Sequence, residues 1–107
     1  MSENFKSFIP FRRDLKTPCM LFAKLEQCGH CHTTAPIMKR VQKELKGIMP
    51  IYLIDAETHK KVCDQLKLRA FPEIMFLGKD RIVRKYNGPR DVRHILSFAN
   101  GHYSMSS

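Results

Sequence analysis

The sequence lacks the features that direct a chain into or across a membrane. No apolar run approaches the ~20 residues that a helix needs to cross a bilayer. The first four residues lack the charged and apolar regions of a secretory signal peptide, and residues 103–107 are not a retrieval signal of the Lys-Asp-Glu-Leu type. We therefore expect a cytoplasmic protein with no membrane partner.

Internal repeats, linkers and low-complexity tracts are also missing from the sequence. The length of 107 residues suits a single domain spanning residues 1–107, and an apolar content of 43% can supply an ordinary hydrophobic core. Such a core needs no structural metal or disulfide. We expect a monomeric domain.

Acidic residues are few, with 10 Asp and Glu against 19 Lys and Arg, and the formal net charge is +9. No recognised nucleic-acid-binding motif accompanies this charge. It therefore indicates either a solvated surface or a surface that attracts an acidic partner. One group of cations recurs along a single predicted helix and comprises Lys39, Arg40, Lys43 and Lys46.

Only four cysteines are present, Cys19, Cys28, Cys31 and Cys63. A disulfide framework in so small a chain would require a secretory context, which the sequence does not indicate. The spacing of Cys28 and Cys31 is instead typical of a redox or metal motif. Because Cys19 and Cys63 lie on apolar faces, we expect buried and inert thiols there, with a regulatory disulfide as the alternative.

The hydrophobic pattern predicts an α/β domain. Strands are expected over residues 19–23, 51–54, 73–77 and 81–86, the last joined to its neighbour by a tight turn. Helices are expected over residues 3–14, from the cysteine pair to Gly47, around residues 62–66, and over residues 92–99. Helical crossovers imply parallel pairing of the first strands, while the final hairpin is antiparallel. The predicted fold is a four-stranded mixed sheet with helices on both faces.

Cys28 stands at the junction of a predicted strand and a predicted helix. The free N–H groups and the dipole at a helix start favour an anion, and a thiolate is the species that attacks disulfides. Cys31 lies one turn later, where it can reach the same sulfur but is more covered. Cys28 is thus the predicted nucleophile and Cys31 the resolving thiol. Gly29 would permit a tight helix entry, and a protonated His30 would stabilise the thiolate.

With its Cys28-Gly29-His30-Cys31 motif the sequence resembles the catalytic domains of protein disulfide isomerases, in the thioredoxin superfamily. The resemblance runs from Glu3 to Phe98 and includes Ala35-Pro36, Asp55-Ala56, Arg69-Ala70-Phe71-Pro72 and the spaced trio Tyr86, Gly88 and Arg90. It implies a thioredoxin-like fold and a protein-disulfide oxidoreductase or isomerase with no cofactor beyond its own dithiol. The partners that it implies are protein thiols or disulfides and an electron donor or acceptor.

The resemblance also implies roles for residues outside the cysteine motif. Pro72 would be a cis-proline facing the disulfide, and the backbone of Phe71 would pair with substrate. Arg69 would tune Cys31. Gln27, beside Cys28, would contact substrate in place of the tryptophan that the family has there.

Three departures from the family pattern accompany the replacement at Gln27. Phe22 stands where the family has a buried acid, and residues 51–54 offer no lysine partner for such an acid. The first edge strand, which in the family precedes Glu3, is expected to be missing. These departures bear on substrate range and proton transfer more than on the fold.

Three alternatives compete with redox catalysis. A metal could bind Cys28, Cys31 and the histidines His30 and His32, with Cys63 and His59 as a second pair, or an iron–sulfur cluster could bridge two subunits. The run from Cys28 to His32 also matches a c-type haem attachment motif, with Met38, Met49 or Met75 as the second axial ligand. Finally, the fold could serve as a non-catalytic binding module that uses a groove at Pro72.

Overall fold

Three apolar segments form the centre of the sheet because their side chains are buried on both faces. In the computed structural model, which describes residues 3–106, these segments are β2 (Cys19–Lys24), β3 (Ile51–Asp55) and β4 (Glu73–Leu77). Every residue of β2 is buried. β2 pairs in parallel with β3 and antiparallel with β4, so it lies in the middle of a mixed sheet.

Two short strands complete the sheet at its edges. β5 (Val83–Lys85) pairs antiparallel with β4, and β1 (Ile9–Pro10) pairs in parallel with β3. The sheet thus has five strands in the order β1-β3-β2-β4-β5. The expected α/β fold with a mixed sheet is confirmed, whereas the expectation of four strands is wrong, because β1 occupies the edge. A strand before Glu3, which was expected to be missing, would lie outside the described residues.

The edge strand arises where a helix over residues 3–14 was expected. Only a 3₁₀ turn, η1 (Glu3–Phe5), forms there. The rings of Phe5 and Phe8 pack against Phe22 of the sheet, with centroids 6.3 and 5.4 Å away. Beyond Pro10, which cannot donate a ladder hydrogen bond, the N–H of Phe11 donates to a carbonyl of β3 at 2.8 Å. Packing of these rings on the sheet therefore prevails over helical spacing.

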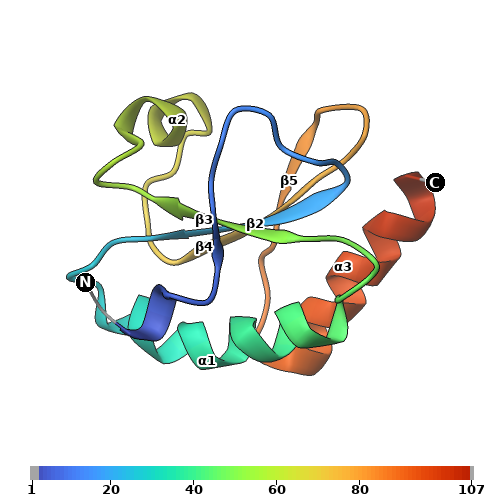
Figure 1. Cartoon of the computed structure of the whole chain (residues 1–107), viewed down its shortest axis with the longest axis horizontal. Helices are drawn as coiled ribbons and strands as arrows, with labels where there is room; N and C mark the ends of the chain where they lie inside the picture. The colour runs from blue at the N-terminus through green and yellow to red at the C-terminus, as the bar shows by residue number, and fades with distance from the viewer. Residues whose placement is uncertain (1–2, 107) are drawn as a thin grey trace.

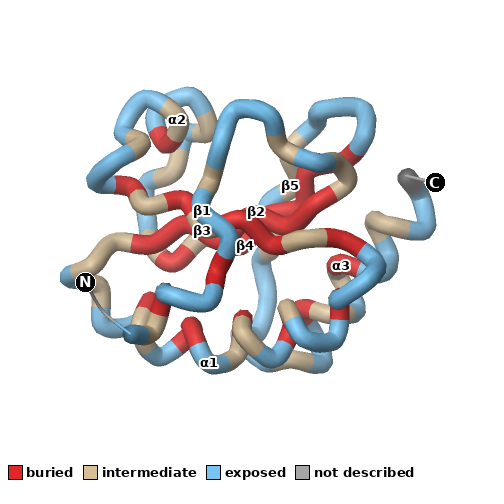
Figure 2. Tube along the Cα trace, viewed as in Figure 1, coloured by how far each residue is buried: buried red, intermediate tan, exposed pale blue. Residues whose placement is uncertain are grey.

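Helices cover both faces of the sheet (Figure 1). α1 (Gly29–Glu44) and α3 (Val92–Ser106) lie on one face, and the shorter α2 (Lys60–Gln65) lies on the other. Figure 2 shows the buried residues concentrated along the sheet and on the inward sides of these helices. Among the described residues, no helix combines the length and apolar character required to span a membrane.

Alternation along β2 divides the core into two clusters. Met20 and Phe22 point toward α1 and α3, in the cluster that also contains Cys31. Cys19 points toward α2, in the cluster that contains Cys63. The cysteines of the motif and the other two cysteines therefore belong to opposite faces of the sheet.

A candidate redox site at the start of helix α1

Cys28 is the N-cap residue of α1. Its backbone is extended (φ −87°, ψ 111°), and its sulfur accepts a hydrogen bond from the N–H of Cys31 at 3.1 Å. The Cys28 side chain is half-buried. A helix N-terminus supplies N–H donors and a positive dipole end, and both favour the thiolate over the neutral thiol.

Cys31, one turn further along α1, is fully buried. Burial raises the pKa of its thiol to about 12, helped by the hydrogen bond to Cys28, while the charge of Arg90 acts in the opposite direction. The two thiols are therefore unequal. One is accessible and placed where an anion is stabilised, and the other is covered and held neutral.

The loop before β4 brings a backbone carbonyl to the nucleophile. The Phe71–Pro72 peptide bond is cis, as the resemblance predicts, and Pro72 is buried. The Cys28 thiol donates a hydrogen bond to the carbonyl of Phe71 at 3.5 Å, across 43 residues of sequence. The structure thus joins the cysteine motif and the Phe71–Pro72 segment in one site.

The remaining residues of the motif lie at its surface. Gln27 and His30 are exposed, His30 on the first turn of α1. Gly29 is also exposed, and a Cβ added to it would meet no atom within 4 Å. We expected the helix entry to require glycine at this position, but the backbone there leaves room for a side chain.

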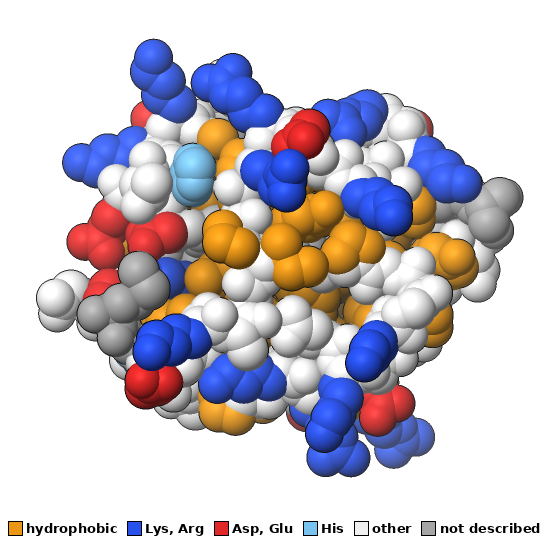
Figure 3. Space-filling model, in the orientation of Figure 1, with side chains coloured by type: hydrophobic (Ala, Val, Ile, Leu, Met, Phe, Trp, Pro, Cys, Tyr) orange, Lys and Arg blue, Asp and Glu red, His pale blue; other side chains and the backbone are white. Residues whose placement is uncertain are grey.

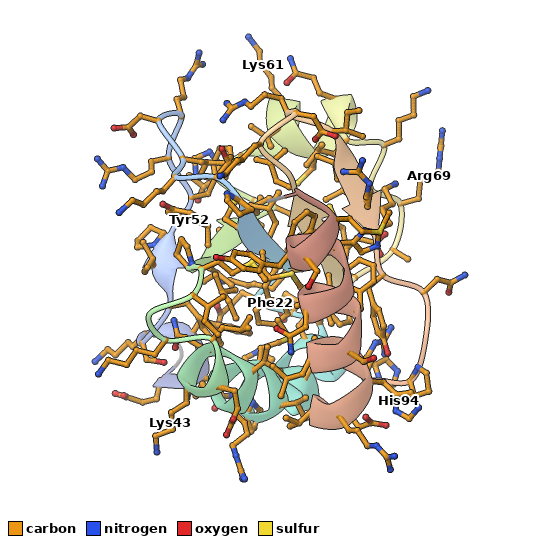
Figure 4. The ribbon with its side chains drawn as sticks, turned by 90° about the vertical axis from the view of Figure 1, so that its right-hand side faces the viewer. Phe22, Lys43, Tyr52, Lys61, Arg69 and His94 are labelled. Carbon is orange, nitrogen blue, oxygen red and sulfur yellow. The ribbon has the colours of Figure 1, made fainter. Side chains whose placement is uncertain are left out.

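Arg90, and not Arg69, is the arginine whose charge acts on Cys31. Arg69 is exposed, and Figure 4 shows its side chain at the periphery, well away from Phe22 in the middle of the molecule. The charge of Arg90 also acts on Glu73, a half-buried carboxyl whose pKa burial raises. Tuning of Cys31 by Arg69 stays a prediction, and Arg90 is a second candidate because its charge opposes the raised pKa of Cys31. The spacing from Tyr86 to Arg90 was the signal in the sequence that pointed to it.

A buried lysine near the site escaped the sequence analysis. The Lys24 side chain is 3% exposed and forms ion pairs with Glu26 at 2.9 Å and Asp55 at 3.2 Å. Its ammonium also lies 4.6 Å from the centroid of the Phe5 ring. Burial opposes the charge on Lys24, but the hydrogen bonds to the two carboxylates outweigh it and raise the pKa of the lysine.

His32 is held by the same part of the molecule and is not a freely solvated residue. Its Nε2 lies 2.7 Å from the carbonyl of Glu26, and its Nδ1 lies 2.8 Å from the side-chain nitrogen of Asn4. A carbonyl only accepts, so Nε2 donates the hydrogen bond to Glu26, and the Glu26 carboxylate lies 3.9 Å from the same nitrogen. The ring also packs 5.0 Å from that of Phe5. His32 thus anchors the first turn of α1 to the N-terminal segment.

The metal alternatives find little support in this arrangement. Cys63 lies in the core on the face opposite Cys31, so it cannot complete one site with Cys28 and Cys31. Over residues 3–106, no three His, Cys, Asp or Glu side chains are grouped so that they could hold a metal ion. The methionines considered as haem ligands, Met38, Met49 and Met75, are buried in the two cores.

Cys19 and Cys63 are buried thiols in the cluster facing α2. Burial raises the pKa of Cys19 to about 12, and it also raises the pKa of Cys63. Both thiols are therefore poor nucleophiles in the folded protein.

Comparisons with known proteins agree with this geometry. Residues 2–101 match the family described as Thioredoxin. Over 72 residues, or 67% of the chain, the sequence is 38% identical to protein disulfide-isomerase like 2-2 of Arabidopsis thaliana and 35% identical to protein disulfide isomerase-like 2-3 of Oryza sativa subsp. japonica. The match spans only 16% of either relative. The J-Trx1 fragment of ERdj5 superposes with a TM-score of 0.82 at 21% identity, over 91% of this chain and 52% of the fragment.

Proposed function

The chain belongs to the thioredoxin family, and from that premise we propose that it is a thiol–disulfide oxidoreductase acting on protein substrates. The observation that carries the proposal is the inequality of the two thiols. Cys28 is accessible at the N-cap of α1, while Cys31 is buried within reach of the same sulfur. Disulfide exchange needs this pairing of an attacking thiolate with a second thiol that releases the substrate.

In the reducing direction the chemistry takes two exchanges. The Cys28 thiolate attacks one sulfur of a substrate disulfide, so a mixed disulfide forms and one substrate thiolate leaves. Cys31 then loses its proton and attacks the sulfur of Cys28, which releases the second substrate thiolate and forms the Cys28–Cys31 disulfide. Two electrons pass from the dithiol to the substrate, and an external thiol or dithiol restores the reduced form. The reverse sequence oxidises a substrate dithiol.

We propose that the segment of Phe71 and Pro72 binds the substrate chain. An extended substrate chain can pair with the Phe71 backbone while its cysteine meets Cys28, whose sulfur lies 3.5 Å from the Phe71 carbonyl. Gln27 and His30 flank this position on the surface. Arg90 is proposed to assist the resolving step, because a cation stabilises the thiolate that Cys31 must form.

Trapping of mixed disulfides tests this assignment. Cys31→Ser should accumulate a mixed disulfide with a disulfide-containing substrate such as scrambled ribonuclease, because attack proceeds and resolution does not. Cys28→Ser should trap almost none, and Cys63→Ser should behave as the wild-type protein does. Equal trapping by the Cys28 and Cys31 variants on a non-reducing gel would refute the assigned roles.

A further inference from the structure

A large groove lies away from the cysteine site, between β1 and the C-terminal half of α1. Its volume is about 1050 Å³, at the upper end of the range for small-molecule pockets. One wall is the segment from Ser7 to Pro18 that carries β1, and the other runs from Pro36 along α1 to the loop that leads into β3. The proposed redox function assigns no role to this groove.

Apolar side chains line the groove and remain open to solvent. Ile9 is 40% exposed and Ile48 is 45% exposed, and both line the groove. Pro18 and Pro36 add to the same surface, and Met49, which also lines the groove, is buried. Figure 3, which views the molecule from the side of the β1 edge, shows hydrophobic side chains gathered across this face with Lys and Arg side chains around them. Exposed apolar surface bordered by charge is typical of an interaction site.

The charged residues that line the groove all have one sign. They are Lys16, Lys39, Arg40, Lys43 and Lys46, and the lining contains no Asp or Glu. Within the described part of the chain, none of the four lysines has a carboxylate within 4.0 Å, and Arg40 reaches Glu44 only at 4.0 Å between exposed side chains. The positive charge on this face is therefore left for an outside partner to neutralise.

We propose that this groove binds an acidic amphipathic helix of a partner protein. Lys39 and Lys43 are spaced by four residues, so they follow one side of α1 and form a charged row parallel to its axis. A helix with an apolar stripe beside a row of carboxylates matches both the apolar lining of the groove and this row of lysines. Pairing of an extended peptide with the sheet edge is a poorer match, because β1 has two residues and Pro10 has no N–H to donate.

The groove and the redox site can be occupied together. Lys43 lies fifteen residues after Cys28 along α1, which places them about 22 Å apart at 1.5 Å per residue. A partner in the groove would thus hold the domain near a substrate without covering Cys28. The inference does not depend on the proposed redox activity, since none of the groove residues belongs to the cysteine site.

Titration with a synthetic probe tests the proposal. The probe is a stapled 16-residue amphipathic helix with leucines on one face and glutamates beside them, and its matched control carries glutamines in place of the glutamates. We expect the acidic peptide to bind the full chain and to shift the NMR signals of Ile9, Ile48 and Met49. The NMR signal of Cys28 should not shift. Binding of the glutamine peptide should be at least tenfold weaker.

Two charge-reversal variants separate the groove from the net charge. Lys43→Glu/Lys46→Glu removes cations from the groove, while Lys60→Glu/Lys61→Glu makes the same change in net charge on α2. Figure 4 shows Lys43 and Lys61 at opposite ends of the molecule. The first variant should weaken binding of the acidic peptide at least tenfold and the second less than threefold.

Four outcomes would overturn the proposal. They are equal weakening by both double variants, equal binding of the two peptides, signal shifts centred outside the groove, and groove-dependent binding of phosphatidylserine vesicles or a DNA duplex without binding of the acidic peptide. Each would assign the charge to general attraction or to another class of partner.

Discussion

The rate at which Cys31 resolves a mixed disulfide should rise steeply with pH. Burial raises the pKa of the Cys31 thiol to about 12. At pH 7 only about one molecule in 10⁵ then carries the Cys31 thiolate, and this fraction grows tenfold with each pH unit. In the mixed disulfide Cys28 no longer titrates, but burial, the larger cause, remains. We therefore expect the resolving rate to increase about a hundredfold between pH 7 and pH 9, without a plateau.

The steepness follows from Phe22, which stands where the family has a buried acid. Phe22 is fully buried in the same cluster as Cys31, and it cannot accept a proton. Phe22→Glu should place an acceptor there, raise the rate near neutral pH and flatten the profile. Phe22→Leu, which shortens the side chain but adds no acid, should retain the steep profile.

Single-turnover kinetics measure this step directly. Cys28 is first joined to thionitrobenzoate, and release of the coloured thiolate by Cys31 is followed in a stopped-flow instrument from pH 6 to pH 9. A wild-type rate that is constant over this interval would show that another group of the protein takes the proton. That result would refute the reasoning from Phe22 and from the burial of Cys31.

The other predictions concern the charged groups around the site. Arg90→Gln should slow resolution severalfold at pH 8, because it removes the cation that opposes the raised pKa of Cys31, while Arg69→Gln should leave the rate unchanged; equal effects would contradict the assignment to Arg90. His30→Pro should lower the reduction potential by tens of millivolts, about 1–3 kcal/mol, because it removes a side chain that stabilises the Cys28 thiolate whenever it is protonated. Equilibration with glutathione measures this change, and an unchanged or higher potential would disprove it. Lys24→Met should reduce the free energy of unfolding in urea by about 1–3 kcal/mol, because it leaves two carboxylates without their buried partner. A loss below a few tenths of a kcal/mol would show that the two ion pairs do not contribute to stability. Since hydrogen bonding to Lys24 lowers the pKa of Glu26, this contribution should be present above the unfolded carboxyl value of about 4.3 and be lost as the pH falls.

Local signals predicted the centre of the molecule and the core of the site. The apolar runs of β2, β3 and β4 are buried as expected, and Cys28 caps α1 where the strand gives way to the helix. A continuous apolar run and a junction between a strand and a helix can both be recognised from neighbouring residues in the sequence. For the same reason the cysteine pair could be placed, and its unequal exposure anticipated, before the fold was known.

The failures concern residues whose partners come from distant segments. Phe5 and Phe8 have a spacing that suits a helix, but their packing on Phe22 draws the chain into η1 and β1 instead. Lys24 looks like the charged end of a strand, and one of its two carboxylate partners, Asp55, lies 31 residues away on β3.

The choice between two arginines also depends on tertiary structure. Both Arg69 and Arg90 lie in segments that resemble the family, and the sequence alone does not show which loop passes near Cys31. The loop between β5 and α3 is shaped by the hydroxyl of Tyr86, which donates to the carbonyl of Pro89 just before Arg90. The path of that loop, a tertiary feature, decides which charge acts on the buried thiol.

Reduction of insulin by dithiothreitol tests the central claim most directly. The purified full chain should accelerate the precipitation of insulin chains well above the rate with dithiothreitol alone. Cys28→Ser should abolish this acceleration, and Cys19→Ser should retain it. Acceleration that survives loss of Cys28, or a wild-type protein with no more activity than dithiothreitol, would contradict the assignment of a thiol–disulfide oxidoreductase.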